Sequence, residues 1–156
     1  AESLGEGARA AGRVEILGTD VDQAALDVAA RARFADAAFA EVPEPLRDRW
    51  FAHAPGAGLR VGARDWEAAP ALQALVRLER LDLLREPPPP GPWHLIVCRN
   101  VVIYFDRDAQ EALFGRFHAA LAPEGFLFLG KVETLLGELR QRYETLEPRE
   151  RIFRRR

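Results

Sequence analysis

Residues 95–105 read Leu-Ile-Val-Cys-Arg-Asn-Val-Val-Ile-Tyr-Phe, and this stretch decides the fold class. Its first apolar run predicts a buried strand that ends at Arg99-Asn100. The chain then stays apolar as far as the pair Tyr104-Phe105, after which Asp106 opens a helix. A charged and an amide side chain between two apolar runs are difficult to explain as core. They are expected at the rim of a ligand crevice, because open α/β sheets bind ligands at the carboxyl ends of their strands.

The pattern on either side of this stretch alternates strands with helices. In chain order it predicts a strand at 14–18, a helix that follows Asp20 or Asp22 and runs to about Arg33, a strand at 94–100, a helix at 108–121, a fully buried strand at 126–129, and a hairpin of 143–146 with 151–153. Asp108 and Glu111 have the spacing of a capping box at the start of the second helix. We therefore expect an α/β fold with a mostly parallel sheet and an antiparallel tail.

A small antiparallel β insertion is predicted at residues 46–78, within a single domain that spans residues 1–156. The insertion begins with a helical turn that ends at Trp50-Phe51. Alternating residues at 59–61 and from Val76 onward then predict strands. The length of 156 residues fits one domain with this insertion inside it.

Composition and charge exclude several classes of protein. With 48% hydrophobic and 29% charged residues the chain is ordinary for a globular domain, and its net charge of −2 gives no general case for binding nucleic acid or membranes. The single cysteine rules out an internal disulfide, and no apolar run approaches the roughly 20 residues of a membrane helix. These features predict a cytoplasmic protein. Because the chain has no methionine and Ala1-Glu2-Ser3-Leu4 lacks a helix cap, we expect it to be part of a longer protein.

Two acidic residues after predicted strands are candidate nucleotide ligands. A carboxylate at Asp20 could accept both hydroxyl protons of a ribose. The alternative is a helix N-cap, but Asp22 is also placed to cap, which slightly favours the ribose. Asp82 could accept from the exocyclic amine of a base, while Leu83 would offer a backbone amide and an apolar wall. A solvent-facing acid at a strand end explains Asp82 equally well.

The residues at the end of the 94–100 strand suggest chemistry less directly. Arg99 could line the crevice or form a salt bridge with a helix acid. Tyr104 could place its hydroxyl over the crevice, or it could pack with Phe105. Cys98 is better explained as a small core residue than as a nucleophile.

Phosphate and metal sites find no support in the sequence. The three histidines show no metal-ligand spacing, with each other or with the cysteine: His53, His94 and His118. No Gly-rich phosphate loop of the dinucleotide-binding or Walker type is present.

Several ordered segments together resemble the catalytic domain of the chemotaxis receptor methyltransferases of the CheR type. They are Gly18-Thr19-Asp20-Val21-Asp22, Arg49-Trp50-Phe51, residues 76–84, residues 97–106 and residues 121–130. The Cys-Arg-Asn-Val and Ile-Tyr-Phe elements of residues 98–105 are highly specific. The Leu-x-Pro-x-Gly turn at 121–125 is common to many methyltransferases. The segments span most of residues 13–156.

The resemblance implies a partial Rossmann-like class I methyltransferase sheet and a protein-glutamate O-methyltransferase. The methyl donor would be S-adenosyl-L-methionine, and the product S-adenosyl-L-homocysteine. The acceptors would be glutamates in the cytoplasmic helical region of methyl-accepting chemotaxis receptors, and the insertion would correspond to a receptor-docking subdomain.

The resemblance also assigns roles to the candidate site residues. Asp20 would bind the ribose, and Asp82 and Leu83 the adenine. Cys98 and Arg99 would line the methionine end of the cofactor. Arg99 and Tyr104 would be the catalytic residues, with Tyr104 near the transferred methyl group.

The chain also departs from the family pattern. The family's Gly-rich cofactor loop, the strand before it and an arginine-bearing helical domain would lie upstream of Ala1. The absent strand would occupy the middle of the sheet, so we expect these 156 residues alone to bind the cofactor weakly or not at all. Gly130-Lys131-Val132-Glu133 differs from the family's usual Gly-His-Ser-Glu, and Asp82 stands where many relatives have Asn.

Two other functions compete with receptor methylation. One is a non-catalytic signalling domain that keeps the fold for partner binding, which the lack of a Gly-rich loop would favour. The other is a nicotinamide-dependent dehydrogenase, which could also use Asp20 to bind a ribose. It is disfavoured because no pair of residues has the character of a hydride-transfer acid.

Overall fold

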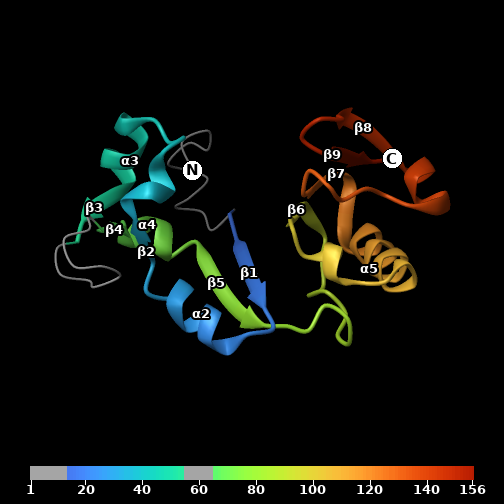
Figure 1. Cartoon of the computed structure of the whole chain (residues 1–156), viewed down its shortest axis with the longest axis horizontal. Coiled ribbons are helices and arrows are strands. Elements are labelled where there is room, and N and C mark those ends of the chain that lie inside the picture. Colours follow the sequence, from blue (N-terminus) through green and yellow to red (C-terminus); the bar gives the residue numbers. More distant parts are fainter. Residues whose placement is uncertain (1–13, 55–64) are drawn as a thin grey trace. The chain divides into compact units, whose positions relative to one another are not determined.

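A computed structural model describes residues 14–54 and 65–156, which fall into two compact units, 1–81 and 82–156 (Figure 1). The predicted strand at 59–61 and the start of the chain lie outside the described residues. Each unit is described by itself.

A pair of parallel strands forms one part of the first unit. Strand β1 (Ile16–Asp20) pairs with β5 (Val76–Arg80), so that Asp20 lies opposite Arg80 where both strands end. Gly18 allows this close pairing, because a Cβ atom there would lie 2.9 Å from the Leu78 side chain. Helix α2 (Gln23–Ala29) follows β1 and buries Leu26. The predicted strand and helix are confirmed, although the helix ends four residues before Arg33.

A small antiparallel sheet forms the other part of the first unit, with strand order β2-β4-β3. Its strands are β2 (Arg33–Ala35), β3 (Phe51–His53) and β4 (Asp65–Ala68), and the elements around it are η1 (Asp36–Phe39), α3 (Glu44–Trp50) and α4 (Pro70–Gln73). An aromatic cluster packs in edge-to-face and tilted contacts: Phe34, Phe39, Phe51 and Trp66. The antiparallel strands thus lie between residues 33 and 68, whereas the strand from Val76 belongs to the parallel pair. Residues 46–78 as a separate subdomain stay a prediction.

The second unit holds a four-stranded sheet with strand order β6-β7-β9-β8. Its strands are β6 (Trp93–Cys98), β7 (Leu121–Leu129), β8 (Tyr143–Glu147) and β9 (Ile152–Arg155). Strands β6 and β7 are parallel, and the other two pairings are antiparallel. Short 3-10 segments, η2 (Val102–Tyr104) and η3 (Gly137–Arg142), connect them. The predicted α/β fold and its antiparallel tail are therefore confirmed, although only one of the three pairings in this sheet is parallel.

Helix α5 (Arg107–Ala120) packs against this sheet and contributes three buried residues to its core. Leu113, Phe114 and Phe117 are buried from the helix side, as its apolar spacing predicts. The helix is capped by Asp106, whose side chain accepts from the Ala109 backbone N–H at 2.8 Å. The predicted capping box at Asp108 is therefore wrong, and Asp108 instead lies in the first turn.

The two parallel strands of the second unit, β6 and β7, are not buried on both sides. Leu95 and Val97 on β6 are 54% and 57% exposed, and Phe126 on β7 is 40% exposed. The alternate residues Cys98 and Leu127 belong to the core. The sequence predicted fully buried strands, because continuous apolar runs do not reveal which face lacks a covering element. No helix in the described residues has the length and apolar character needed to cross a membrane.

Candidate functional site

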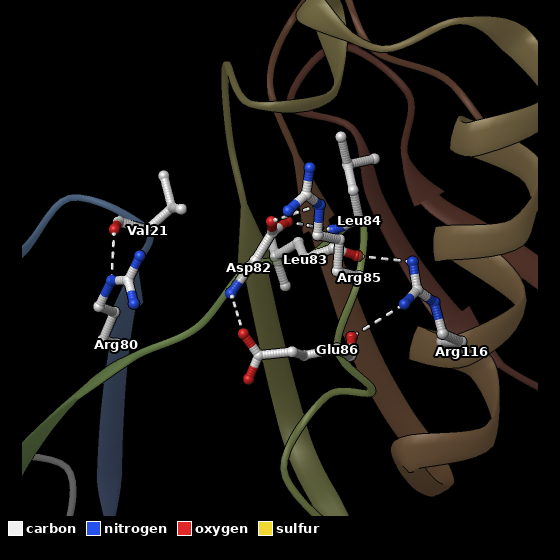
Figure 2. A network of polar contacts seen from close by, with 8 residues as sticks. All are labelled: Val21, Arg80, Asp82, Leu83, Leu84, Arg85, Glu86 and Arg116. Atoms are coloured by element: carbon white, nitrogen blue, oxygen red, sulfur yellow. Dashed lines mark hydrogen bonds and ion pairs between the residues drawn. The ribbon is translucent and has the colours of Figure 1, made fainter.

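The loop after β1 is closed by its own two aspartates. Asp22 caps α2, because its Oδ1 accepts from the Ala24 N–H at 2.8 Å. Asp20 is exposed at the strand end, and its Oδ1 accepts from the Asp22 N–H at 2.9 Å. Arg80 on the neighbouring strand donates to the Val21 carbonyl at 3.0 Å, as Figure 2 shows. The cap therefore belongs to Asp22, and the alternative interpretation of Asp20 as the helix cap is wrong.

Residues 82–86, hereafter the Asp82 turn, open the second unit. The Arg85 and Glu86 N–H groups both donate to the Asp82 carbonyl, at 3.1 and 2.8 Å. The Leu84 N–H donates to Asp82 Oδ1 at 2.9 Å, and Glu86 Oε1 accepts from the Asp82 N–H at 3.2 Å (Figure 2). The turn is thus fixed internally by hydrogen bonds that all involve Asp82.

Arg116 on α5 holds the Asp82 turn from outside. Its Nη2 donates to the Leu83 carbonyl at 2.6 Å, and its Nη1 donates to the Glu86 carbonyl at 2.9 Å (Figure 2). The Leu83 side chain packs against the hydrophobic core that also contains Cys98. The structure therefore joins two of the predicted site residues, Leu83 and Cys98, to one core.

The loop after β6 is held by a single buried carboxylate, that of Glu133. The side chain is 3% exposed and accepts four backbone hydrogen bonds. Its Oε1 accepts from Val101 and Val102 at 2.9 and 3.0 Å, and its Oε2 accepts from Asn100 and Gly130 at 3.1 and 2.6 Å. A buried charge is tolerated only when it is well hydrogen-bonded, and these donors meet that need. Glu133 thus ties the ends of β6 and β7 together.

Two backbone features make this arrangement possible. Asn100 has φ of +58°, in the left-handed region that asparagine tolerates better than most residues. Gly130 approaches so closely that a Cβ atom there would lie 2.7 Å from both Asn100 Oδ1 and Glu133 Oε2. Sequence reasoning missed the role of Glu133, because three of its four backbone partners lie more than 30 residues away. The only signal was that Gly130 and Glu133 keep the outer positions of the family's four-residue run.

The loop presents Arg99 and Tyr104 to solvent. The Arg99 guanidinium lies over the Phe128 ring, with its carbon 4.8 Å from the ring centroid. Among the described residues Arg99 forms no ion pair with a helix acid, the structural alternative for this side chain. Tyr104 lies on η2 and is 81% exposed, so it does not pack in the core.

Cys98 is a core residue at the foot of the same loop. It is 5% exposed, and burial, followed by the nearby charge of Glu133, raises the pKa of its thiol to about 12. A thiol with such a pKa is almost entirely protonated at neutral pH and is a poor nucleophile. This agrees with its interpretation as a small core residue.

Metal ions in proteins are commonly bound by His, Cys, Asp and Glu side chains. Among the described residues, no group of three or more of these side chains could hold a metal ion.

Comparisons with known proteins give a family match along almost the whole chain. Residues 1–152 match the model of the CheR methyltransferase SAM-binding domain. A probable chemotaxis protein methyltransferase of Rhizobium etli is 30% identical over 132 residues, which cover 85% of this chain and 48% of that protein. Chemotaxis protein methyltransferase 1 of Pseudomonas aeruginosa is 31% identical over 122 residues, which cover 78% of this chain and 42% of that protein.

Over shorter stretches of the chain the sequence identity to such relatives is higher. A chemotaxis protein methyltransferase of Klebsiella aerogenes is 48% identical over 63 residues, which cover 40% of this chain and 22% of that protein. The chain spans less than half the length of these three relatives.

Proposed function

Because this chain belongs to the family of the CheR methyltransferase SAM-binding domain, we propose that it supplies the cofactor-binding half of a protein-glutamate O-methyltransferase. The acceptors would be glutamate side chains of chemotaxis receptors, which fits the relatives' description as chemotaxis protein methyltransferases. One observation carries the proposal most: the loop after β6 is fixed by Glu133 while Arg99 and Tyr104 remain exposed on it. A rigid loop that presents a guanidinium and a phenol is suited to hold a carboxylate in place.

The candidate ligands fit an adenosyl cofactor by their chemistry. Asp20 and Asp82 offer carboxylate oxygens that accept hydrogen bonds, as ribose hydroxyls and an exocyclic amine require. Asp20 is exposed at the end of a parallel strand, and the Asp82 side chain is 28% exposed. In this proposal Asp20 binds the ribose, Asp82 and Leu83 bind the adenine, and Cys98 and Arg99 line the methionine end.

The methyl transfer needs no general base from the protein. S-adenosyl-L-methionine supplies an electrophilic methyl group, and a glutamate carboxylate is already a competent nucleophile at neutral pH. Arg99 and Tyr104 need only donate hydrogen bonds that orient the acceptor carboxylate, without removing a proton. Tyr104→Phe should therefore lower kcat by about tenfold, the value of one hydrogen bond to a charged group, and leave stability unchanged because the side chain is exposed.

Activity is tested with the natural full-length chain that contains these residues. The protein is incubated with methyl-labelled cofactor and receptor-containing membranes, and the membranes are then treated with base. Label released as methanol identifies glutamyl esters and supports the proposal. Cofactor binding without transferred label would instead favour the non-catalytic signalling domain.

The small sheet of the first unit is proposed to dock the receptor. A cavity of about 520 Å³ lies beside β3, β4 and α3, and its lining includes charged side chains of both signs, among them Arg33, Asp48 and Glu67. A photo-crosslinking residue placed at His53, on the exposed end of β3, should capture receptor. The same residue placed at Arg107 in the second unit should not, and equal capture at both positions would contradict the docking role.

A further inference from the structure

The Asp82 turn needs an external support to have a defined orientation. Its own hydrogen bonds fix its internal shape but use neither the Leu83 carbonyl nor the Glu86 carbonyl. Both of these carbonyls accept from one side chain, Arg116, which lies 33 and 30 residues further along the chain. The turn is thus anchored to α5 at two points.

Arginine is the one side chain suited to this contact. Its planar guanidinium presents two parallel N–H donors in a fixed geometry, whereas lysine offers a single point charge on a flexible stem. Arg116 Nε is buried and meets no acceptor in the described part of the chain. The hydrogen bonds from Nη1 and Nη2 to the turn therefore explain why this cation is held in a partly buried position.

The orientation of the turn decides what Asp82 can bind. Its Oδ1 already accepts from the Leu84 N–H, while its Oδ2 lies 3.6 Å from Arg85 Nε, beyond hydrogen-bond distance. Arg85 and Asp82 form an ion pair at this distance, but the Arg85 side chain is 87% exposed, and such a surface pair competes only weakly with a bound ligand. A carboxylate oxygen held in this way attracts an N–H donor and repels a carbonyl oxygen.

The geometry points to Arg116 as a positioning residue that sets base specificity. By holding the Leu83 and Glu86 carbonyls, it orients Asp82 so that the carboxylate accepts from the exocyclic amine of adenine and disfavours a base with oxygen at that position. This inference rests on the proposed function, because it needs an adenosyl cofactor at the Asp82 turn. It assigns to α5 a role in recognition besides its role in the core.

The test compares two ligands by calorimetry on the natural full-length chain: S-adenosylhomocysteine and S-inosylhomocysteine, which carries oxygen in place of the amine. The unaltered protein should prefer the adenosyl ligand by at least about tenfold, since one hydrogen bond to a charged group is worth that much. Arg116→Lys should reduce this preference to below about threefold, by weakening adenosyl binding and leaving inosyl binding nearly unchanged. Arg107→Lys, on the exposed first turn of α5, is the matched control and should change neither affinity.

The outcomes separate the inference from the proposed function. If the unaltered protein binds neither ligand, the proposed function fails and the inference fails with it. If Arg116→Lys weakens both ligands by the same factor, or neither, Arg116 has no part in base recognition and the inference is overturned.

A second variant keeps the test decisive if Arg116→Lys does not fold. Asp82→Ala leaves Arg116 and the core in place and should abolish the preference for the adenosyl ligand. An unchanged ratio of the two affinities in Asp82→Ala would overturn the inference, because the carboxylate that Arg116 orients would then not read the base.

Discussion

The loop after β1 and the loop after β6 are held in different ways. The side-chain acceptors of the loop after β1 come from the loop itself, since Asp20 and Asp22 accept from N–H groups two residues further on. Arg80 of β5 adds one bond to the Val21 carbonyl. The loop after β6 depends on Glu133, about 30 residues away, which accepts four backbone N–H groups from two chain segments. A locally closed loop can change without disturbing its unit, whereas a loop held by one distant carboxylate fails together with that carboxylate.

The largest expected effect comes from removing that carboxylate. Glu133→Ala leaves buried N–H groups without an acceptor and should lower the free energy of unfolding by about 4 kcal/mol or more. Glu133→Gln retains one acceptor oxygen and should cost about half as much. Urea denaturation of the full-length protein measures both, and Glu138→Gln, an exposed glutamate on η3, is the control. Equal stability of Glu133→Ala and the control would break the comparison of the two loops.

Cys98 provides a local probe of the same loop. Because burial raises its pKa to about 12, the thiol should react very slowly with a disulfide reagent at pH 8 in the folded protein. Glu133→Ala should speed this reaction, while changes in the loop after β1 should not.

The next effect concerns binding at the loop after β1. If Asp20 binds the ribose as proposed, Asp20→Ala should weaken binding of S-adenosylhomocysteine by roughly 10- to 100-fold, because two ribose hydroxyls would lose their acceptor. Stability should change little, since Asp20 is exposed and does not cap α2. Calorimetry gives the affinity and urea denaturation the stability. Loss of stability without loss of affinity would assign Asp20 a purely structural role.

Asp22→Ala should lower stability and leave the affinity for the cofactor nearly unchanged, the reverse of Asp20→Ala. Loss of the α2 cap should lower the free energy of unfolding by about 1 kcal/mol. Asp22→Asn keeps a side-chain oxygen and should be close to the unaltered protein. Thermal unfolding followed by circular dichroism measures the difference. A cofactor affinity that fell as far as in Asp20→Ala would show that the two aspartates do not divide these roles.

The smallest expected effect is a pH dependence of stability in the second unit. Burial lowers the pKa of His118 below its ordinary value of 6.5, and Arg155 and Arg142 lower it further. The unfolded chain therefore takes up a proton before the folded unit does, so this unit should lose stability as the pH falls below about 6.5. In NMR spectra recorded as the pH is lowered, the backbone amide signals of residues 99–102 should weaken before those of residues 20–22. His118→Gln should remove this pH dependence. The control is His94→Gln, at an exposed position on β6, and it should leave the pH dependence unchanged.

Much of the fold could be predicted from the sequence, because it depends on local patterns. The strand at 94–100 and the helix after it follow from an apolar run and an apolar stripe. Asp106 was predicted to open that helix and does cap it, whereas the capping box predicted from Asp108 and Glu111 is wrong, because Asp108 lies in the first turn. Strand β2 was missed, because a strand of three residues is too short to show an alternating pattern and its pairing partner, β4, begins about 30 residues further along the chain.

The candidate site shows the same division. Asp22 as a cap, and Cys98 as a core residue, could be inferred from their immediate neighbours. Glu133 and Arg116 could not, because each contacts backbone groups about 30 residues away. Every residue except proline has the same backbone N–H and C=O groups, so a side chain that binds backbone groups far away in the sequence cannot be recognised until the fold is known.

The close approach at Gly130 has a consequence for redesigning this loop. Position 130 admits no side chain, and position 133 must supply a carboxylate, but the two residues between them, Lys131 and Val132, are exposed. This explains how the chain tolerates a pair different from the family's His-Ser there. Libraries that diversify 131–132 together with exposed Ile103 should yield mostly folded variants, whereas those that include 130 or 133 should yield few.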